Sequence, residues 1–213
     1  DAHTGLAAMA EENFFGKTAP QEPSAERMTA TFIDNPDTGV TVMDWEVGAS
    51  GYAAVWAEEN TRASIWDAMK RREVYATTGP RMIVRFFGGW EFTEADARNR
   101  LPAETGYARG VPMGGELPTP PEGAGAPTFL VAALRDPIGA NLDRIQVVKG
   151  WLGADGTLNE RVYDVVWSGD RAADTNTGMV PPVGSTVDVA SATYVNSIGA
   201  PELLAVWSDP EFD

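Results

Sequence analysis

Residues 52–87, YAAVWAEENTRASIWDAMKRREVYATTGPRMIVRFF, carry the succession of signals that decides the local fold. The opening run YAAVWA is apolar and of strand length. EENTR follows, and its Asn60 or Thr61 suits the N-cap of a helix. ASIWDAMKRRE then has apolar residues at helical spacing and ends with cations, which complement the negative end of the helix dipole. This segment therefore predicts a strand followed by a helix.

The remainder of the stretch predicts two more strands. VYATTGP (74–80) indicates a short strand that enters a turn, and MIVRFF (82–87) indicates another strand. Strand, helix and strand within about thirty residues are typical of a βα-type connection, so we expect residues 1–90 to be mixed α/β. Upstream, DNPDTG (34–39) predicts a turn, because Asn before Pro, Asp and Gly are turn residues. Its two aspartates lack the spacing of a calcium loop.

The pattern changes in the second half of the chain. Residues 110–128 are rich in Gly and Pro and predict neither helix nor central strand. Five segments of strand length follow: TFLVAALRD, RIQVVKGWL, RVYDVVWS, TVDVASATYV and ELLAVWS. The Asp-Gly between the second and third predicts a hairpin turn. We therefore expect an α+β protein, with a Gly/Pro-rich connection over 91–128 and an antiparallel, sandwich-like β-rich region over 129–213.

Composition excludes several classes of partner. The formal net charge of −15 argues against nucleic acid and anionic membranes, because both are bound through basic surface. The sequence has no apolar run of about 18 residues, so we expect no membrane insertion. It has no cysteine, which excludes disulfides and thiolate chemistry but is compatible with a cytoplasmic or an exported protein.

Positive charge is nevertheless concentrated in one segment. Residues 60–85 contain Arg62, Lys70, Arg71, Arg72, Arg81 and Arg85 against Asp67 and Glu73. This local excess suits an anionic substrate, with Arg81, Thr77, Thr78 and Arg62 as candidate contacts. A solvated helix end that follows the dipole rule explains the same charges, so both interpretations remain open.

Asp1 and His3 are candidate metal ligands. A carboxylate and an imidazole one residue apart can reach one metal from an extended segment. His3 is the sole histidine, and a chain end without function explains the pair equally simply. Two ligands are too few for tight binding, so we expect no tightly bound metal in this chain alone.

DAHTGL and RREVYATTGPR resemble the end of the catalytic domain of PHP-type (polymerase and histidinol phosphatase) metallohydrolases, in particular the carbaryl-hydrolase-like branch. More closely, AVWAEENTR, ATTGPR, NLDRIQVVKGWL, VYDVVWS and VGSTVDVA together resemble domain-of-unknown-function family 3604, a family of exported bacterial proteins. The resemblance implies that residues 1–90 are the C-terminal segment of a PHP-like α/β barrel. It implies a periplasmic or secreted location.

The resemblance also assigns residues. The superfamily's last metal motif falls on Asp1 and His3, and its earlier ligands have no counterpart here. It implies a divalent metal (zinc, manganese or iron) in an intact enzyme of which this chain is the C-terminal part. Glu58, Glu59 and Arg62 match the family motif; the two glutamates either support the metal ligands from behind or form an ion pair that orients the helix.

These considerations lead to two functional hypotheses. The first is a fragment of a metal-dependent hydrolase that acts on a small phosphoester or carboxylic ester and is inactive by itself. The second is a non-catalytic β-sandwich module for binding or packing. A segment cut from a barrel would expose an apolar face, so we also expect self-association, or the missing N-terminal half bound over residues 50–90. The residues expected on that face are Tyr52, Val55, Trp56, Ile65, Met69 and Val74.

Overall fold

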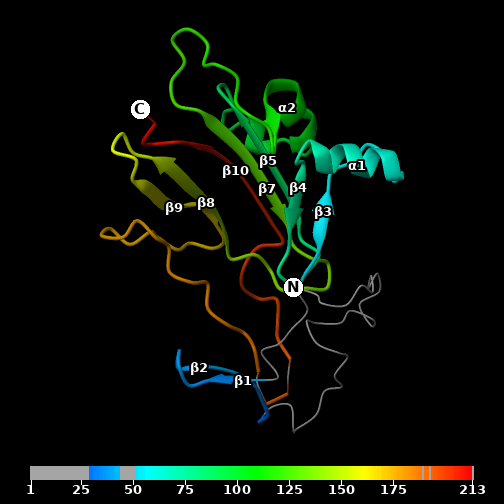
Figure 1. Cartoon of the computed structure of the whole chain (residues 1–213), viewed down its shortest axis with the longest axis vertical. Helices are drawn as coiled ribbons and strands as arrows, with labels where there is room; N and C mark the ends of the chain where they lie inside the picture. The colour runs from blue at the N-terminus through cyan, green and yellow to red at the C-terminus, as the bar shows by residue number, and fades with distance from the viewer. Residues whose placement is uncertain (1–28, 44–50, 189, 192, 213) are drawn as a thin grey trace. The chain divides into compact units, whose positions relative to one another are not determined.

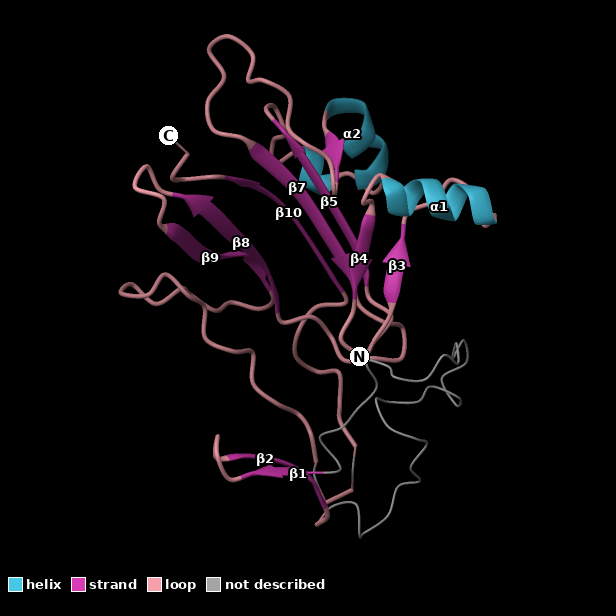
Figure 2. Ribbon diagram, in the orientation of Figure 1, coloured by secondary structure: helices cyan, strands magenta, loops and turns pink. Residues whose placement is uncertain are grey.

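A computed structural model describes residues 29–43, 51–188, 190–191 and 193–212 (Figure 1). The chain divides into two compact units, residues 1–54 with 75–81 and residues 55–74 with 82–213, and each is considered by itself. Strands predominate over helices, as Figure 2 shows. None of the described helices is long and apolar enough to cross a membrane.

The predicted strand, helix and strand are all present. They are β3 (Ala53–Val55), α1 (Arg62–Lys70) and β4 (Val74–Ala76). Thr61 caps α1 by accepting a hydrogen bond of 3.2 Å from the Ser64 N–H. The hydrogen bonds flanking the strands run from Trp56 N to Glu73 O and from Thr77 N to Tyr52 O, so the pairing is antiparallel. Strand β4 therefore runs antiparallel to β3, whereas the strands of a parallel βαβ unit run in the same direction.

Helix α1 ends in a left-handed turn at Arg72, whose φ is 63°. The Arg72 N–H bonds the Met69 carbonyl, and the Glu73 N–H bonds the Ala68 carbonyl. Glycine is the usual residue at such a position, because a Cβ is crowded in the left-handed region. The turn redirects the chain so that Glu73 points into the protein and is 3% exposed.

A four-stranded antiparallel sheet forms the centre of the second unit. Its order is β10-β7-β5-β6, with β5 (Ile83–Gly89), β6 (Val111–Pro112), β7 (Thr128–Leu134) and β10 (Glu202–Ser208). In Figure 1, β10, β7 and β5 lie side by side. The expectation of a β-rich protein with antiparallel strands is confirmed. The expected α/β-barrel segment is not supported, because the described strands form separate antiparallel sheets that do not close into a barrel.

Two hairpins complete the described strands. β8 (Arg144–Leu152) pairs with β9 (Leu158–Trp167) across the predicted Asp-Gly turn, where Gly156 has a φ of 83°. The predicted turn over 34–39 joins β1 (Thr31–Asn35) to β2 (Val40–Met43).

The prediction of a strand over 186–195 is wrong. Only the isolated bridge between Asp188 and Thr193 is found in its described part. The Asp188 carboxylate instead accepts hydrogen bonds from the Ala190 N–H and the Ser191 hydroxyl, which is local turn chemistry that competes with strand pairing.

The core contains a helix that the sequence pattern did not reveal. Phe87, Phe92 and Leu130 are buried together, and α2 (Pro102–Arg109) packs on them. A Cβ added at Gly106 would lie 2.4 Å from the Phe87 ring, so the missing side chain permits this close contact. The next residue, Tyr107, meets the edge of the same ring at 5.1 Å between centroids. The packing thereby fixes where the Tyr107 side chain lies.

Charged side chains that are largely or partly buried hold the segment 168–183 against the β8–β9 hairpin. Arg144 Nη1 lies 3.0 Å from the Asp164 carboxylate, whose side chain is 1% exposed. Arg171 Nη1 lies 2.7 Å from Asp143. Both guanidinium groups and both carboxylates also bond backbone atoms of this segment, at Val180, Pro181 and Val183. Each charge is thus compensated, as buried ions require.

Candidate functional site

A polar pocket of about 580 Å³ lies in the second unit. It is lined by residues that follow β3 and α1 and by side chains of β5, α2 and β6: Trp56, Ala57, Glu58, Arg71, Glu73, Arg85, Tyr107 and Pro112. Its size is typical of a site for a small organic molecule. Two guanidinium groups and two carboxyl groups therefore share one pocket.

Glu73 is the buried acid of this pocket. One of its carboxylate oxygens accepts from Arg71 Nη2 at 3.3 Å. The other accepts from the Tyr107 hydroxyl. A buried carboxylate is costly unless it is paired and hydrogen-bonded, and both conditions are met here. Arg71 is therefore largely occupied in balancing Glu73.

Tyr107 connects the acid to the second arginine. Its hydroxyl donates to Glu73 and accepts from Arg85 Nη1 at 3.0 Å. Partial burial raises the pKa of the Tyr107 hydroxyl above its usual 10.0, and the hydrogen bond to Glu73 raises it further. Tyr107 thus stays neutral at physiological pH and keeps its proton for the bond to Glu73.

Arg85 is held between two aromatic side chains. Its Cζ lies 3.1 Å from the centre of the Trp56 ring and 5.7 Å from that of Tyr107. Trp56 is itself fixed, because its indole N–H donates to the Val84 carbonyl at 3.0 Å. No carboxylate of the described residues lies within 4.0 Å of the Arg85 guanidinium. Half-buried Arg85 therefore has no ion-pair partner among the described residues, although the Glu58 carboxylate lines the same pocket beyond that distance.

Three of the predicted anion contacts lie in the first unit. Thr77 is buried; its hydroxyl accepts from the Tyr52 N–H at 3.0 Å, and its N–H bonds the Tyr52 carbonyl. Thr78 is exposed. Arg81 is exposed and lies with its Cζ 5.7 Å from the centre of the Tyr52 ring. The Thr77 hydroxyl thus already accepts a backbone hydrogen bond next to the paired strands β3 and β4.

The remaining predicted site residues are spread over several places. Glu58 is exposed and lines the polar pocket. Glu59 is exposed, and its N–H donates to the Ser64 hydroxyl at 3.1 Å. Asp1 and His3 fall outside the described residues. Within the described part of the chain, no group of three or more His, Cys, Asp or Glu side chains is placed to hold a metal ion.

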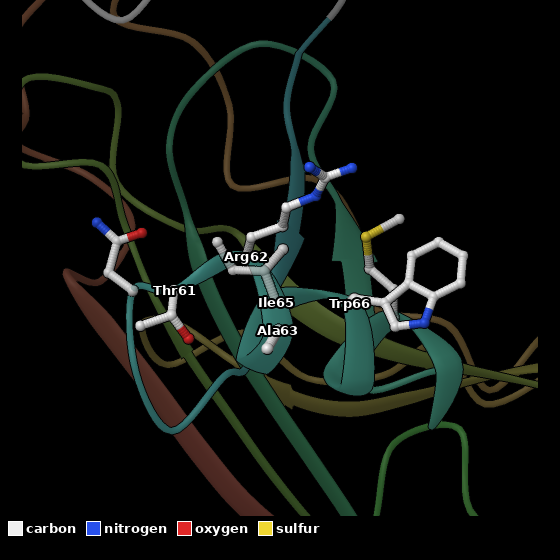
Figure 3. A pocket seen from close by; sticks show the side chains of 7 residues that line it. Thr61, Arg62, Ala63, Ile65 and Trp66 are labelled. Atoms are coloured by element: carbon white, nitrogen blue, oxygen red, sulfur yellow. The ribbon is translucent and has the colours of Figure 1, made fainter.

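Arg62 belongs to a second, larger hollow of about 940 Å³ along α1 (Figure 3). The lining is otherwise uncharged and includes Ile65, Trp66 and Met69. Trp66 and Met69 are 64% and 53% exposed. Figure 3 shows Ile65 and Trp66 projecting from the helix. We call this hollow the α1 groove. It shares Ile65 and Met69 with the apolar face expected from the sequence. None of the six residues expected on that face is fully buried.

The main residues of the polar pocket were missed by sequence reasoning. The sequence places Trp56 only among the residues expected on an exposed apolar face, and Tyr107 lies in a helix that the sequence pattern does not predict. Arg85 was counted only as part of the local charge. A signal was present, since Arg85 stands between apolar residues in the strand MIVRFF, where a cation needs an explanation.

The fold and the pocket define a β-rich, antiparallel-sheet protein with a polar pocket that is lined by two arginines and two glutamates. The family model described as protein of unknown function (DUF3604) matches residues 1–213, and the chain belongs to this family. Comparisons with curated proteins and with solved structures gave no match.

Proposed function

We propose that this chain is part of a metal-dependent hydrolase and supplies the pocket that holds the acidic group of a small phosphoester or carboxylic ester. The observation that carries the proposal is Arg85, a half-buried cation without a carboxylate partner among the described residues, within a pocket of suitable size. The resemblance of DAHTGL and ATTGPR to PHP-type metallohydrolases supports the hydrolytic part, and it also supports a periplasmic or secreted location.

The metal is a separate component of the proposal. A metal site needs about three or four protein ligands, and the described residues do not provide such a set by themselves. Asp1 and His3 are the ligands that the resemblance assigns. A bound divalent metal would supply an activated water for ester cleavage. The described residues are proposed only to bind and orient the anionic substrate.

Hydrolysis of p-nitrophenyl phosphate and p-nitrophenyl acetate with added zinc, manganese or iron tests the proposal. The chain is assayed as it stands, and within the longer polypeptide that we propose contains it. We expect activity in the longer polypeptide, abolished by His3→Ala. Arg85→Gln should raise the KM for the phosphate ester more than it lowers kcat.

Arg98→Gln is the matched control, because the Arg98 side chain is 81% exposed and, among the described residues, pairs only with exposed Glu94. It should leave both kinetic constants unchanged. Absence of hydrolysis with every metal, together with retained anion binding, would favour the non-catalytic binding module instead. Equal effects of Arg85→Gln and Arg98→Gln would show that the pocket does not receive the substrate.

A further inference from the structure

We infer that Arg85 binds the ligand's oxyanion through its Nε–Nη2 edge, and that the ligand is an organic carboxylate or phosphate monoester with an apolar body. The inference rests on the proposed function only for the choice of an anionic ligand. It concerns which atoms bind and what else the ligand must carry.

The first step is the unequal use of the guanidinium. Nη1 of Arg85 donates to the Tyr107 hydroxyl at 3.0 Å. Among the described residues, no acceptor makes a hydrogen bond to Nε or Nη2 of Arg85. Nε–H and one Nη2–H of a guanidinium are parallel and lie on the same edge, which is the edge that two oxygens of a carboxylate or phosphate meet in a bidentate pair. The protein has therefore left open the edge best suited to an oxyanion.

The second step is that this edge is held in place before any ligand arrives. Trp56 lies against the guanidinium face at 3.1 Å, and its own N–H is fixed to Val84. Tyr107 is fixed by Glu73 on one side and by its contact with Phe87 on the other. A donor pair that is already oriented loses less rotamer entropy on binding, which strengthens a short ionic contact.

Arg71 does not offer an equivalent site. Its Nη2 is paired with the buried Glu73 at 3.3 Å, and its side chain is 51% exposed. An anion there would compete with a buried carboxylate that has no other cation within reach among the described residues. The two arginines thus have different roles, since Arg71 balances Glu73 and Arg85 faces the ligand.

The pocket also constrains the rest of the ligand. About 580 Å³ is much more than one phosphate or carboxylate group needs. Pro112, Ala57 and the aromatic rings of Trp56 and Tyr107 provide apolar surface in the same pocket as Arg85. A ring or short hydrocarbon attached to the oxyanion would cover this surface, whereas inorganic phosphate would leave it hydrated.

NMR titration of the full chain tests the inference, with the Nε–H signal of Arg85 as the reporter. That signal is assigned by its absence in Arg85→Lys. The probes are phenyl phosphate, benzoate, inorganic phosphate and the neutral analogue benzyl alcohol. We expect phenyl phosphate or benzoate to shift the Nε–H signal and to bind more tightly than inorganic phosphate, and benzyl alcohol to leave the signal unchanged. The relative affinity of phenyl phosphate and benzoate decides between a phosphate and a carboxylate.

Arg85→Lys keeps the charge but removes the paired donors, so it should weaken binding by about tenfold or more. Arg98→Lys is the matched control and should bind as the unaltered chain does. The inference is overturned if Arg85→Lys keeps full affinity, if benzyl alcohol binds equally well, or if none of the anions shifts the Arg85 signal. None of these readouts requires turnover. Failure of the inference can therefore be distinguished from failure of the proposed hydrolysis.

Discussion

At the scale of single residues, the pocket depends on a chain of contacts in which each group fixes the next. Glu73 is buried, Tyr107 donates a hydrogen bond to it, and Arg85 is oriented by Tyr107 and Trp56. This series of contacts holds the Arg85 guanidinium in one position, whereas an exposed arginine side chain would be mobile. Removing one member should therefore affect both stability and binding.

Tyr107→Phe tests this coupling. The change removes the hydroxyl that satisfies Glu73, so we expect the free energy of unfolding to fall by about 1 to 3 kcal/mol. Anion binding at Arg85 should also weaken. Urea denaturation measures the first effect. Tyr194→Phe is the control, since Tyr194 is exposed and its hydroxyl donates to the Ile138 carbonyl. A loss equal to that of Tyr107→Phe would contradict the coupling.

Arg72 offers a second test at the same scale. Its φ of 63° is a left-handed conformation that glycine adopts without crowding. Arg72→Gly should raise the free energy of unfolding by about 0.5 to 1 kcal/mol, despite loss of the exposed pair with Glu116. Arg72→Ala removes the same side chain but retains a Cβ, so it should give no gain. Equal stabilities of the two variants would show that the turn is not strained.

At the scale of elements, the segment 168–183 is held by ions rather than by strand pairing. Burial alone would raise the pKa of Asp143, but hydrogen bonds from Arg144, the Val183 N–H and Arg171 together hold it below the usual 3.8. A carboxyl with a lowered pKa in the folded protein stabilises it above pH 3.8, and this contribution disappears as the pH falls through the folded-state pKa.

Asp143→Asn should therefore destabilise the protein in a manner that depends on pH. We expect a loss of about 1 to 3 kcal/mol at neutral pH, since hydrogen bonds to an ionised group are removed. The difference from the unaltered chain should shrink as the pH falls below 3.8 and through the lowered folded-state pKa, where Asp143 itself becomes protonated. Urea denaturation across this range provides the measurement. Asp170→Asn, at an exposed position, should have little effect at any pH.

Prediction from sequence succeeded where local chemistry determines the element. The N-cap at Thr61 and the Asp-Gly turn between β8 and β9 are encoded within a few residues. Helix α2 was missed because its decisive residue, Gly106, disfavours a helix by itself and is explained only by the Phe87 ring. The polar pocket was missed for a related reason, since Trp56, Arg85 and Tyr107 are far apart in the chain and meet only after folding.

At the scale of the whole molecule, a strongly acidic chain exposes one basic and apolar helix. The α1 groove combines Arg62 with exposed Trp66 and Met69, and the net charge of the chain is −15. Apolar side chains of this size on one exposed helix face are typical of contact surfaces. The α1 groove is therefore the surface at which the self-association expected from the sequence can be tested.

Size-exclusion chromatography with light scattering makes that test. We expect the chain to form dimers or larger species at micromolar concentration, and the double change Trp66→Ser with Met69→Ser to shift it to the monomer. Ile138→Ser is the control, because Ile138 is 68% exposed outside the α1 groove. A monomer at every concentration, or dispersal by the control, would show that the groove does not mediate association.

The contact between Gly106 and Phe87 also limits how this sequence can diverge. A methyl group at 106 has room only if the ring at 87 becomes smaller, and a smaller residue at 87 leaves a void unless position 106 grows. Neither exchange is neutral by itself, so the two positions are expected to change together among relatives or not at all. Because Tyr107 contacts Phe87 and lines the pocket, substitutions at positions 87 and 106 would also displace a pocket residue. Relatives that retain the pocket are therefore expected to retain this pair of residues.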